Sequence, residues 1–219
     1  MPYGTTNCAW DSPIDLNQFW KFCNEVCGGS AVLFAQTPFD KMLGASNIEN
    51  LRYEWIWEKR KATGHLNVTK CPLKAHENIL VFGKTKYFPQ KSTGHERLIK
   101  SGKKVDETSV YGKQNFDELK YDSTERFPRS VINSFPDAEL ITKYKHPTRK
   151  PQELMEYLVR TYTQPGDTVL DPFMGSGTTG VACKLLDRKF IGIEKEQEYF
   201  EMATQRLDEI GSLSDLIKG

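Results

Sequence analysis

The chain has 219 residues, of which 38% are hydrophobic and 27% are charged, and its formal net charge is +1. Length and composition fit a globular protein with one domain and an insertion, or with two small domains. The longest apolar runs, at 31–35 and 79–82, are far shorter than the roughly 20 residues that cross a bilayer, which excludes a membrane span. The first residues carry no secretory signal, so we expect a cytoplasmic protein.

Five cysteines in a chain of this length do not form the framework of a disulfide-rich protein. Cys23 and Cys27 could join Cys71 and His76 in a zinc site. The first two, however, lie four residues apart in a stretch with helical periodicity, which favours buried cysteines of a helix. We therefore expect no metal.

Charge is unevenly distributed along the chain. Between residues 84 and 104, seven Lys or Arg stand against a single Glu, whereas residues 194–209 contain six acidic side chains. The basic segment is suited to contact phosphate groups, although a solvated loop explains it equally well.

The N-terminal half predicts alternating helices and strands. Residues 14–26 have the periodicity of an amphipathic helix that ends at Gly28 and Gly29, and residues 31–35 form a buried strand. A short helix is expected from about Asp40.

A strand with an aromatic face follows, because Tyr53, Trp55 and Trp57 alternate with other residues. We expect these rings in the core rather than stacked on bases. Residues 78–82 predict the next strand. From 83 to 144 the periodicity fades, which indicates an inserted module.

Regular elements return after Pro151, which suits the first turn of a helix. A strand at 168–171 ends in a carboxylate, a helix follows at 178–186, and a strand at 190–193 precedes a final helix to about 210. This β-α-β-α alternation predicts a parallel sheet.

The turn between the first strand and helix of this run carries Gly175, Gly177 and Gly180. Glycines at such a turn let a ligand approach the backbone and the helix N-terminus, and Glu194 after the next strand is suited to ribose hydroxyls. A P-loop is excluded because no Gly-Lys-Ser/Thr follows. The spacing alone leaves a dinucleotide, S-adenosylmethionine and an empty tight turn open, but Asp171 before the turn favours the positively charged S-adenosylmethionine.

The sequence DPFMGSGTTG at 171–180, preceded by HPTRKP at 146–151, resembles the cofactor half of the DNA amino-methyltransferases, which modify adenine N6 or cytosine N4. MPYG at 1–4 resembles the end of the family's catalytic motif, and this alignment implies a strand and a polar residue before Met1. The order of the motifs is similar to that of the β class.

The resemblance implies an α/β, Rossmann-like S-adenosylmethionine-dependent methyltransferase fold with a doubly wound, mostly parallel sheet. Residues 1–83 would form its catalytic half, residues 84–144 a target-recognition insertion, and residues 145–219 its cofactor-binding half.

The resemblance also implies the site residues. Pro2 would offer its carbonyl to the target amine, and Tyr3 would stack on a base flipped out of the duplex. Lys59, Arg60 and Lys61 would contact DNA phosphates. The implied cofactor-binding residues are His146, Thr148, Lys150, Asp171, Pro172, Phe173, Gly175, Gly177, Thr178 and Glu194.

The expected function is site-specific methylation of double-stranded DNA within a restriction-modification setting, with S-adenosylmethionine as methyl donor and adenine N6 preferred. Cytosine N4 methylation and a binding remnant without activity are the alternatives. A nicotinamide-dependent oxidoreductase is disfavoured because nothing else in the chain supplies a hydride-transfer site. A homodimer and a restriction partner both stay open.

Overall fold

The fold comes from a computed structural model, which divides the chain into two compact units, one of residues 1–88 and 130–219 and one of residues 89–129. The two units are described separately. The residues that the structure describes are 1–4, 11–12, 14–101, 120–133, 135 and 149–217.

The first unit begins with helix α1 (Leu16–Cys27). Asp15 caps it, because its carboxylate accepts hydrogen bonds from the first free N–H groups of the helix. Gly28 ends it with φ of 59°, a left-handed conformation that favours glycine. The helix therefore lies within two residues of its predicted bounds.

A four-stranded mixed sheet follows, in the order β1-β3-β2-β6. β3 is antiparallel to both β1 and β2, and β6 is parallel to β2. The short helix α2 connects β1 to β2. The bounds are β1 (Ala31–Ala35), α2 (Phe39–Ala45), β2 (Leu51–Thr63), the 3-10 turn η1 (His65–Asn67), β3 (Lys74–Phe82) and β6 (Val131–Ile132).

The central strand β3 is buried on both faces. Leu80 and Phe82 belong to a cluster with α1, while Ile79 and Val81 belong to a second cluster with Trp55 and Trp57. The core position predicted for these two tryptophans is confirmed. Tyr53, by contrast, is 40% exposed.

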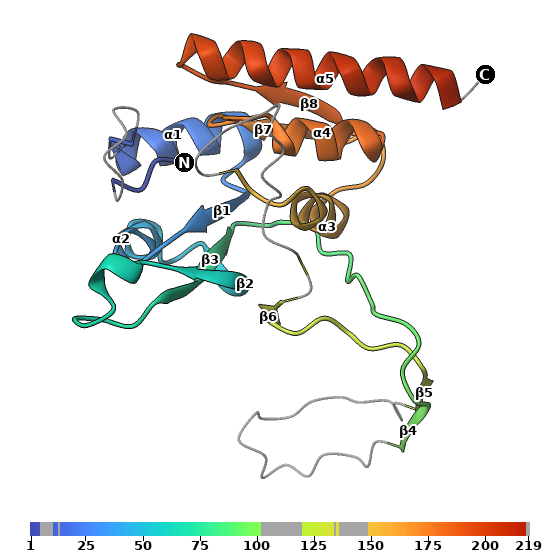
Figure 1. The fold of residues 1–219 in the computed structure, drawn as a ribbon. Coiled ribbons are helices and arrows are strands. Elements are labelled where there is room, and N and C mark those ends of the chain that lie inside the picture. The colour runs from blue at the N-terminus through green and yellow to red at the C-terminus, as the bar shows by residue number, and fades with distance from the viewer. Residues whose placement is uncertain (5–10, 13, 102–119, 134, 136–148, 218–219) are drawn as a thin grey trace. The chain divides into compact units, whose positions relative to one another are not determined.

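The C-terminal part of the unit consists of α3 (Gln152–Tyr162), β7 (Thr168–Asp171), α4 (Thr178–Leu185), β8 (Lys189–Gly192) and α5 (Gln197–Ile217). β7 and β8 pair in parallel, as their alternation with helices predicts. Figure 1 shows α3, α4 and α5 grouped with these two strands.

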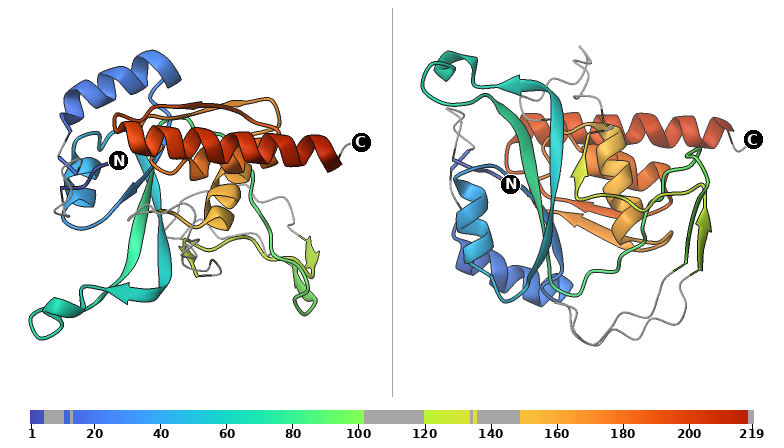
Figure 2. Two further views of the ribbon diagram at one scale, coloured as in Figure 1. Left: turned by 45° about the horizontal axis from the view of Figure 1, so that its top comes forward. Right: turned by 90° about the horizontal axis from the view of Figure 1, so that it is seen from below.

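The predicted α/β, Rossmann-like fold is confirmed, and the four-stranded sheet is mixed because β3 alone runs against β1, β2 and β6. The chain returns from β2 to β3 through residues 64–73, and such a hairpin joins antiparallel strands. Figure 2 shows this β2–β3 hairpin extending away from the helices of the unit.

Within the described residues, the edge strands of the four-stranded sheet are β1, which pairs only with β3, and β6, which pairs only with β2. β7 and β8 pair only with each other there. No described helix is long and apolar enough to span a membrane.

The second unit contains β4 (Leu98–Ser101) and β5 (Lys120–Ser123), which pair antiparallel. Arg97 donates two hydrogen bonds to Asp122 across this pair. The unit falls inside the 84–144 stretch for which the sequence predicts a target-recognition insertion.

Candidate functional site

The glycine-rich turn starts where β7 ends, at Asp171. The carboxylate of Asp171 accepts a hydrogen bond from the N–H of Phe173 at 3.1 Å and from the hydroxyl of Thr179 at 2.5 Å. The side chain is half-buried. It is therefore held in place at the mouth of the turn by its own loop and by the first residues of α4.

The three glycines of the turn serve different purposes. Gly175 and Gly177 have φ of 49° and 70°, in the left-handed region that other residues rarely adopt. Gly180 lies within α4, where a Cβ would come within 2.6 Å of the Phe190 ring. The first two shape the turn, and the third lets α4 approach β8 closely.

Glu194, the predicted ribose ligand, is bound to the same turn. One carboxylate oxygen accepts from the N–H of Gly175 at 2.9 Å, and the other accepts from the N–H groups of Lys195 and Glu196 at 2.9 and 3.1 Å. A carboxylate has about four lone-pair positions, so it retains acceptor capacity for a hydroxyl group.

An arginine that was not predicted from the sequence supports the glycine-rich turn from the protein interior. Arg206 of α5 is 5% exposed, and it donates to the carbonyl of Ser176 at 3.0 Å and to the hydroxyl of Thr178 at 3.1 Å. The Thr178 hydroxyl thus faces the protein interior. At a ligand site, Thr178 would act through its main chain at the N-terminus of α4.

The segment that carries Pro2 and Tyr3 is held by a buried aspartate. Asp11 accepts hydrogen bonds from the N–H groups of Tyr3 at 2.6 Å and of Gly4 at 2.8 Å. The Tyr3 ring stacks on Phe39 of α2, with centroids 5.8 Å apart and an interplanar angle of 25°. Both the backbone and the ring of Tyr3 are therefore fixed.

This segment adjoins the glycine-rich turn. Met1 and Tyr3 pack against the same core cluster around α1 as Phe173 of the turn. Tyr3, predicted as catalytic, and Phe173, predicted to bind the cofactor, thus come together, although they are far apart in the sequence.

A second carboxylate links three of the predicted residues. Glu77 of β3 lies 2.6 Å from the Nζ of Lys59 and 2.7 Å from the Nζ of Lys150, and it accepts a hydrogen bond of 3.4 Å from the Tyr3 hydroxyl. Lys59 therefore has an acidic partner inside the chain, and its side chain is only 12% exposed.

Burial by itself raises the pKa of Glu77, but the charges and hydrogen bonds of Lys150 and Lys59 outweigh it, so this pKa is lowered. Burial and the neighbouring Glu77 raise the pKa of Tyr3 well above its usual value. The group therefore consists of an ionised carboxylate, two ammonium groups and a neutral phenol. The Lys150 ammonium also lies 5.7 Å from the centroid of the Tyr3 ring.

The remaining predicted residues are placed as follows. Phe173 packs against the core cluster of α1, and its ring centroid lies 6.2 Å from that of Phe19. Arg60 and Lys61 are exposed on the β2–β3 hairpin. Pro2 and Pro172 are half-buried beside Tyr3 and Asp171 in the chain. Two predicted residues, His146 and Thr148, lie outside the described residues.

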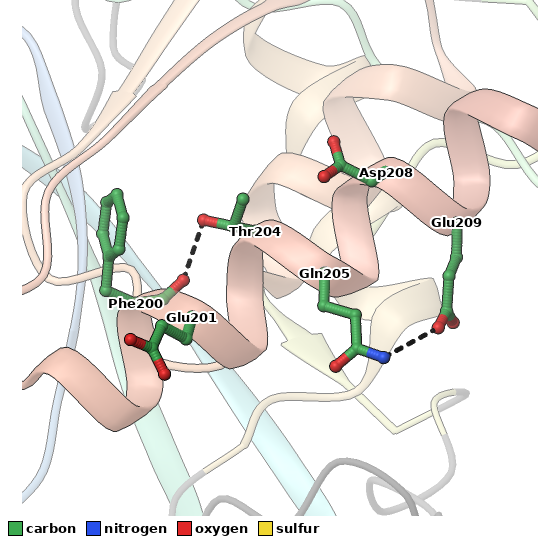
Figure 3. A pocket seen from close by; sticks show the side chains of 6 residues that line it. All are labelled: Phe200, Glu201, Thr204, Gln205, Asp208 and Glu209. Atoms are coloured by element: carbon green, nitrogen blue, oxygen red, sulfur yellow. Dashed lines mark hydrogen bonds between the residues drawn. The ribbon is translucent and has the colours of Figure 1, made fainter.

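Two surface hollows lie away from the glycine-rich turn and the Tyr3 segment. One is lined by α5 alone, so it is a depression in a helix surface (Figure 3), and a second lies between α2 and β2. In the described part of the chain, no three His, Cys, Asp or Glu side chains gather in a way that could hold a metal. The α5 hollow is lined by Phe200, Glu201, Thr204, Gln205, Asp208 and Glu209.

Comparison with solved structures identifies similar chains. The crystal structure of the M1.HpyAVI–SAM complex is 30% identical, with a TM-score of 0.59, and the match covers 88% of this chain and 81% of that one. The PvuII DNA methyltransferase, described as cytosine-N4-specific, shares the fold at 19% identity, with a TM-score of 0.59 over 86% of this chain and 69% of that one.

Sequence comparison gives the same family. The type II methyltransferase M2.DpnII of Streptococcus pneumoniae is 55% identical over 64 residues, which are 29% of this chain and 24% of that relative. The match thus spans about a quarter of the curated relative. The model of the DNA methylase family, N6_N4_Mtase, matches residues 1–205. The chain therefore belongs to the DNA methylase family.

Proposed function

We propose that the chain takes part in methyl transfer from S-adenosylmethionine to the exocyclic amine of a base in double-stranded DNA, with adenine N6 as the preferred target. The observation that carries this proposal is the packing of Tyr3 and of Phe173 in the glycine-rich turn against the same core cluster, since it places a fixed aromatic beside a cofactor-type loop. Membership of the DNA methylase family and the likeness to the M1.HpyAVI–SAM complex support it.

The residues of the turn fit S-adenosylmethionine. The carboxylate of Asp171 is half-buried, and it is charge-complementary to the ammonium and sulfonium groups of the cofactor. Gly175 and Gly177 bring the backbone close enough for contact, and Glu194 keeps acceptor capacity for ribose hydroxyls. Lys150, with His146 and Thr148, would close the pocket.

Bound there, S-adenosylmethionine supplies an activated methyl group. The amine of adenine or cytosine is a weak nucleophile because its lone pair is delocalised into the ring, so the protein must orient that lone pair. The Pro2 carbonyl would accept a hydrogen bond from the amine and stabilise the positive charge that develops on nitrogen. Tyr3 would stack on the flipped base.

DNA contact is assigned to the hairpin and to the second unit. Arg60 and Lys61 lie on the exposed part of β2, where phosphate groups can reach them. We infer that residues 84–144 form the target-recognition region, between a catalytic half at 1–83 and a cofactor half at 145–219. The likeness to a type II methyltransferase supports a restriction-modification setting.

The test is transfer of a labelled methyl group from S-adenosylmethionine to unmethylated duplex DNA, followed by digestion to nucleosides. Label in N6-methyl-2′-deoxyadenosine supports the proposal, and label in N4-methyl-2′-deoxycytidine moves the target to cytosine. Cofactor and DNA binding without transfer would identify a binding remnant. Failure to bind S-adenosylmethionine would refute the cofactor assignment.

A further inference from the structure

A single acidic side chain, Glu77, precedes the apolar part of β3 and is nevertheless buried. Glu77 precedes Asn78 and the run Ile79–Phe82 in β3, and its side chain is only 9% exposed. Burying an isolated carboxylate is costly unless charges and hydrogen bonds compensate for the lost water. The position therefore requires partners, and these partners come from distant parts of the chain.

The partners of Glu77 belong to three segments. Lys59 on β2 approaches one carboxylate oxygen, and Lys150, just before α3, approaches the other. The Tyr3 hydroxyl donates to the oxygen that Lys150 also uses. One carboxylate thus joins the N-terminal segment, the DNA-facing hairpin and the start of the C-terminal part.

We propose that Glu77 is a positioning residue of the target-base pocket, which fixes Tyr3 and offsets one of the two positive charges of Lys59 and Lys150 beside it. The proposal rests on the proposed function. Its electrostatic basis is simple: methyl transfer to an amine develops positive charge on nitrogen, and two uncompensated ammonium groups nearby would oppose that charge. Glu77 pairs with both lysines and reduces their combined charge from +2 to a net +1 for the group.

The same link explains why Tyr3 is a tyrosine. Its ring is held by Phe39 on one side, and its hydroxyl is held by Glu77. A stacking surface requires only an aromatic ring, so the hydroxyl contributes orientation rather than contact with a base. Loss of that orientation misplaces the ring, and a displacement of about 1 Å can cost about 100-fold in rate.

The test compares Glu77→Gln with Glu58→Gln. Glutamine keeps the size of the side chain and removes its charge, and Glu58 is an exposed residue of β2 next to Lys59. We expect Glu77→Gln to lower kcat by about 10- to 100-fold, while KM for S-adenosylmethionine stays within about twofold. Glu58→Gln should change neither.

Tyr3→Phe provides the second variant, since it breaks the same link from the other side and keeps the ring. It should lower kcat, and its effect should add only partly to that of Glu77→Gln, because Tyr3→Phe removes the hydrogen bond that Glu77→Gln weakens. An unchanged kcat in either variant, or full additivity, would overturn the proposal.

A chemical measurement separates this inference from the proposed function. Acylation of lysines, read by mass spectrometry, should be slow at Lys59 and Lys150 and fast at the exposed Lys70 in the wild-type protein. Glu77→Gln should accelerate it at both buried lysines. If wild-type protein shows slow acylation at Lys59 and Lys150 but no methyl transfer, only the proposed function is refuted. Equal reactivity at all three lysines would overturn the role of Glu77.

Discussion

The contact between α4 and β8 yields a quantitative prediction at Gly180. An alanine Cβ at this position would lie 2.6 and 2.7 Å from two carbons of the Phe190 ring and 3.0 Å from Leu207. Overpacking of this kind typically costs about 1–3 kcal/mol, whereas replacing a helical glycine by alanine returns about 1 kcal/mol of helix propensity. We expect Gly180→Ala to lower the free energy of unfolding by up to about 2 kcal/mol.

Gly44 offers a matched control, because it is also a helical glycine. A Cβ there would meet Leu51 at 3.6 Å, an ordinary van der Waals distance. Gly44→Ala should therefore gain about 0.5–1 kcal/mol from helix propensity alone.

Urea unfolding followed by circular dichroism measures both variants. Both substitutions replace a helical glycine by alanine. Changes of opposite sign in the free energy of unfolding would therefore identify the effect of the contact with Phe190. A Gly180→Ala protein stabilised as much as Gly44→Ala would refute the close approach of α4 to β8. The same variant should weaken S-adenosylmethionine binding, since the turn precedes α4 directly.

Three further predictions concern the residues that support the site. Arg206→Met leaves two buried oxygen atoms of the turn without their donor, so we expect a loss of about 1–3 kcal/mol in the free energy of unfolding and weaker cofactor binding in calorimetry. Asp11→Asn replaces a charged acceptor of the Tyr3 and Gly4 N–H groups, and should lower methyl transfer while cofactor binding persists; equal losses in both would contradict this. The lowered pKa of Glu77 contributes stability that is fully present above the carboxyl's usual value of 4.5 and is lost as pH falls from there through the lowered pKa. The stability gap between wild type and Glu77→Gln should therefore be constant from about pH 7 to 5 and shrink below pH 4.5 in urea titrations. A gap that stays constant below pH 4.5 would contradict the ion pairs.

The glycine-rich turn could be located from the sequence with little error. The strand ends at Asp171 and the helix begins at Thr178, as predicted, because strand-end carboxylate and glycine spacing are local signals. The helices were likewise found within a few residues, except that α5 continues to Ile217 rather than ending near 210. β2 continues to Thr63, beyond its aromatic face, because pairing with β3 resumes after a bulge.

The supporting residues could not be found in this way. Asp11, Glu77 and Arg206 act on residues that are 7 to 74 positions away, so only tertiary structure brings the partners together. For Glu77 a signal existed, since a carboxylate beside the apolar run of β3 needs compensation. The sequence around Arg206 gives no comparable indication, because this residue lies in a helix rich in acidic side chains, a pattern typical of a solvent-exposed surface.

The open edge of β1 has a consequence for handling the protein. The strand AVLFA contains no charge, proline or glycine, which are the residues that usually discourage edge-to-edge pairing. Among the described residues, one edge of β1 pairs with no strand, so its N–H and C=O groups can pair with an extended chain, including another molecule of the same protein. Concentrated preparations should therefore become turbid with time, and a lysine introduced on β1 should delay the onset of light scattering.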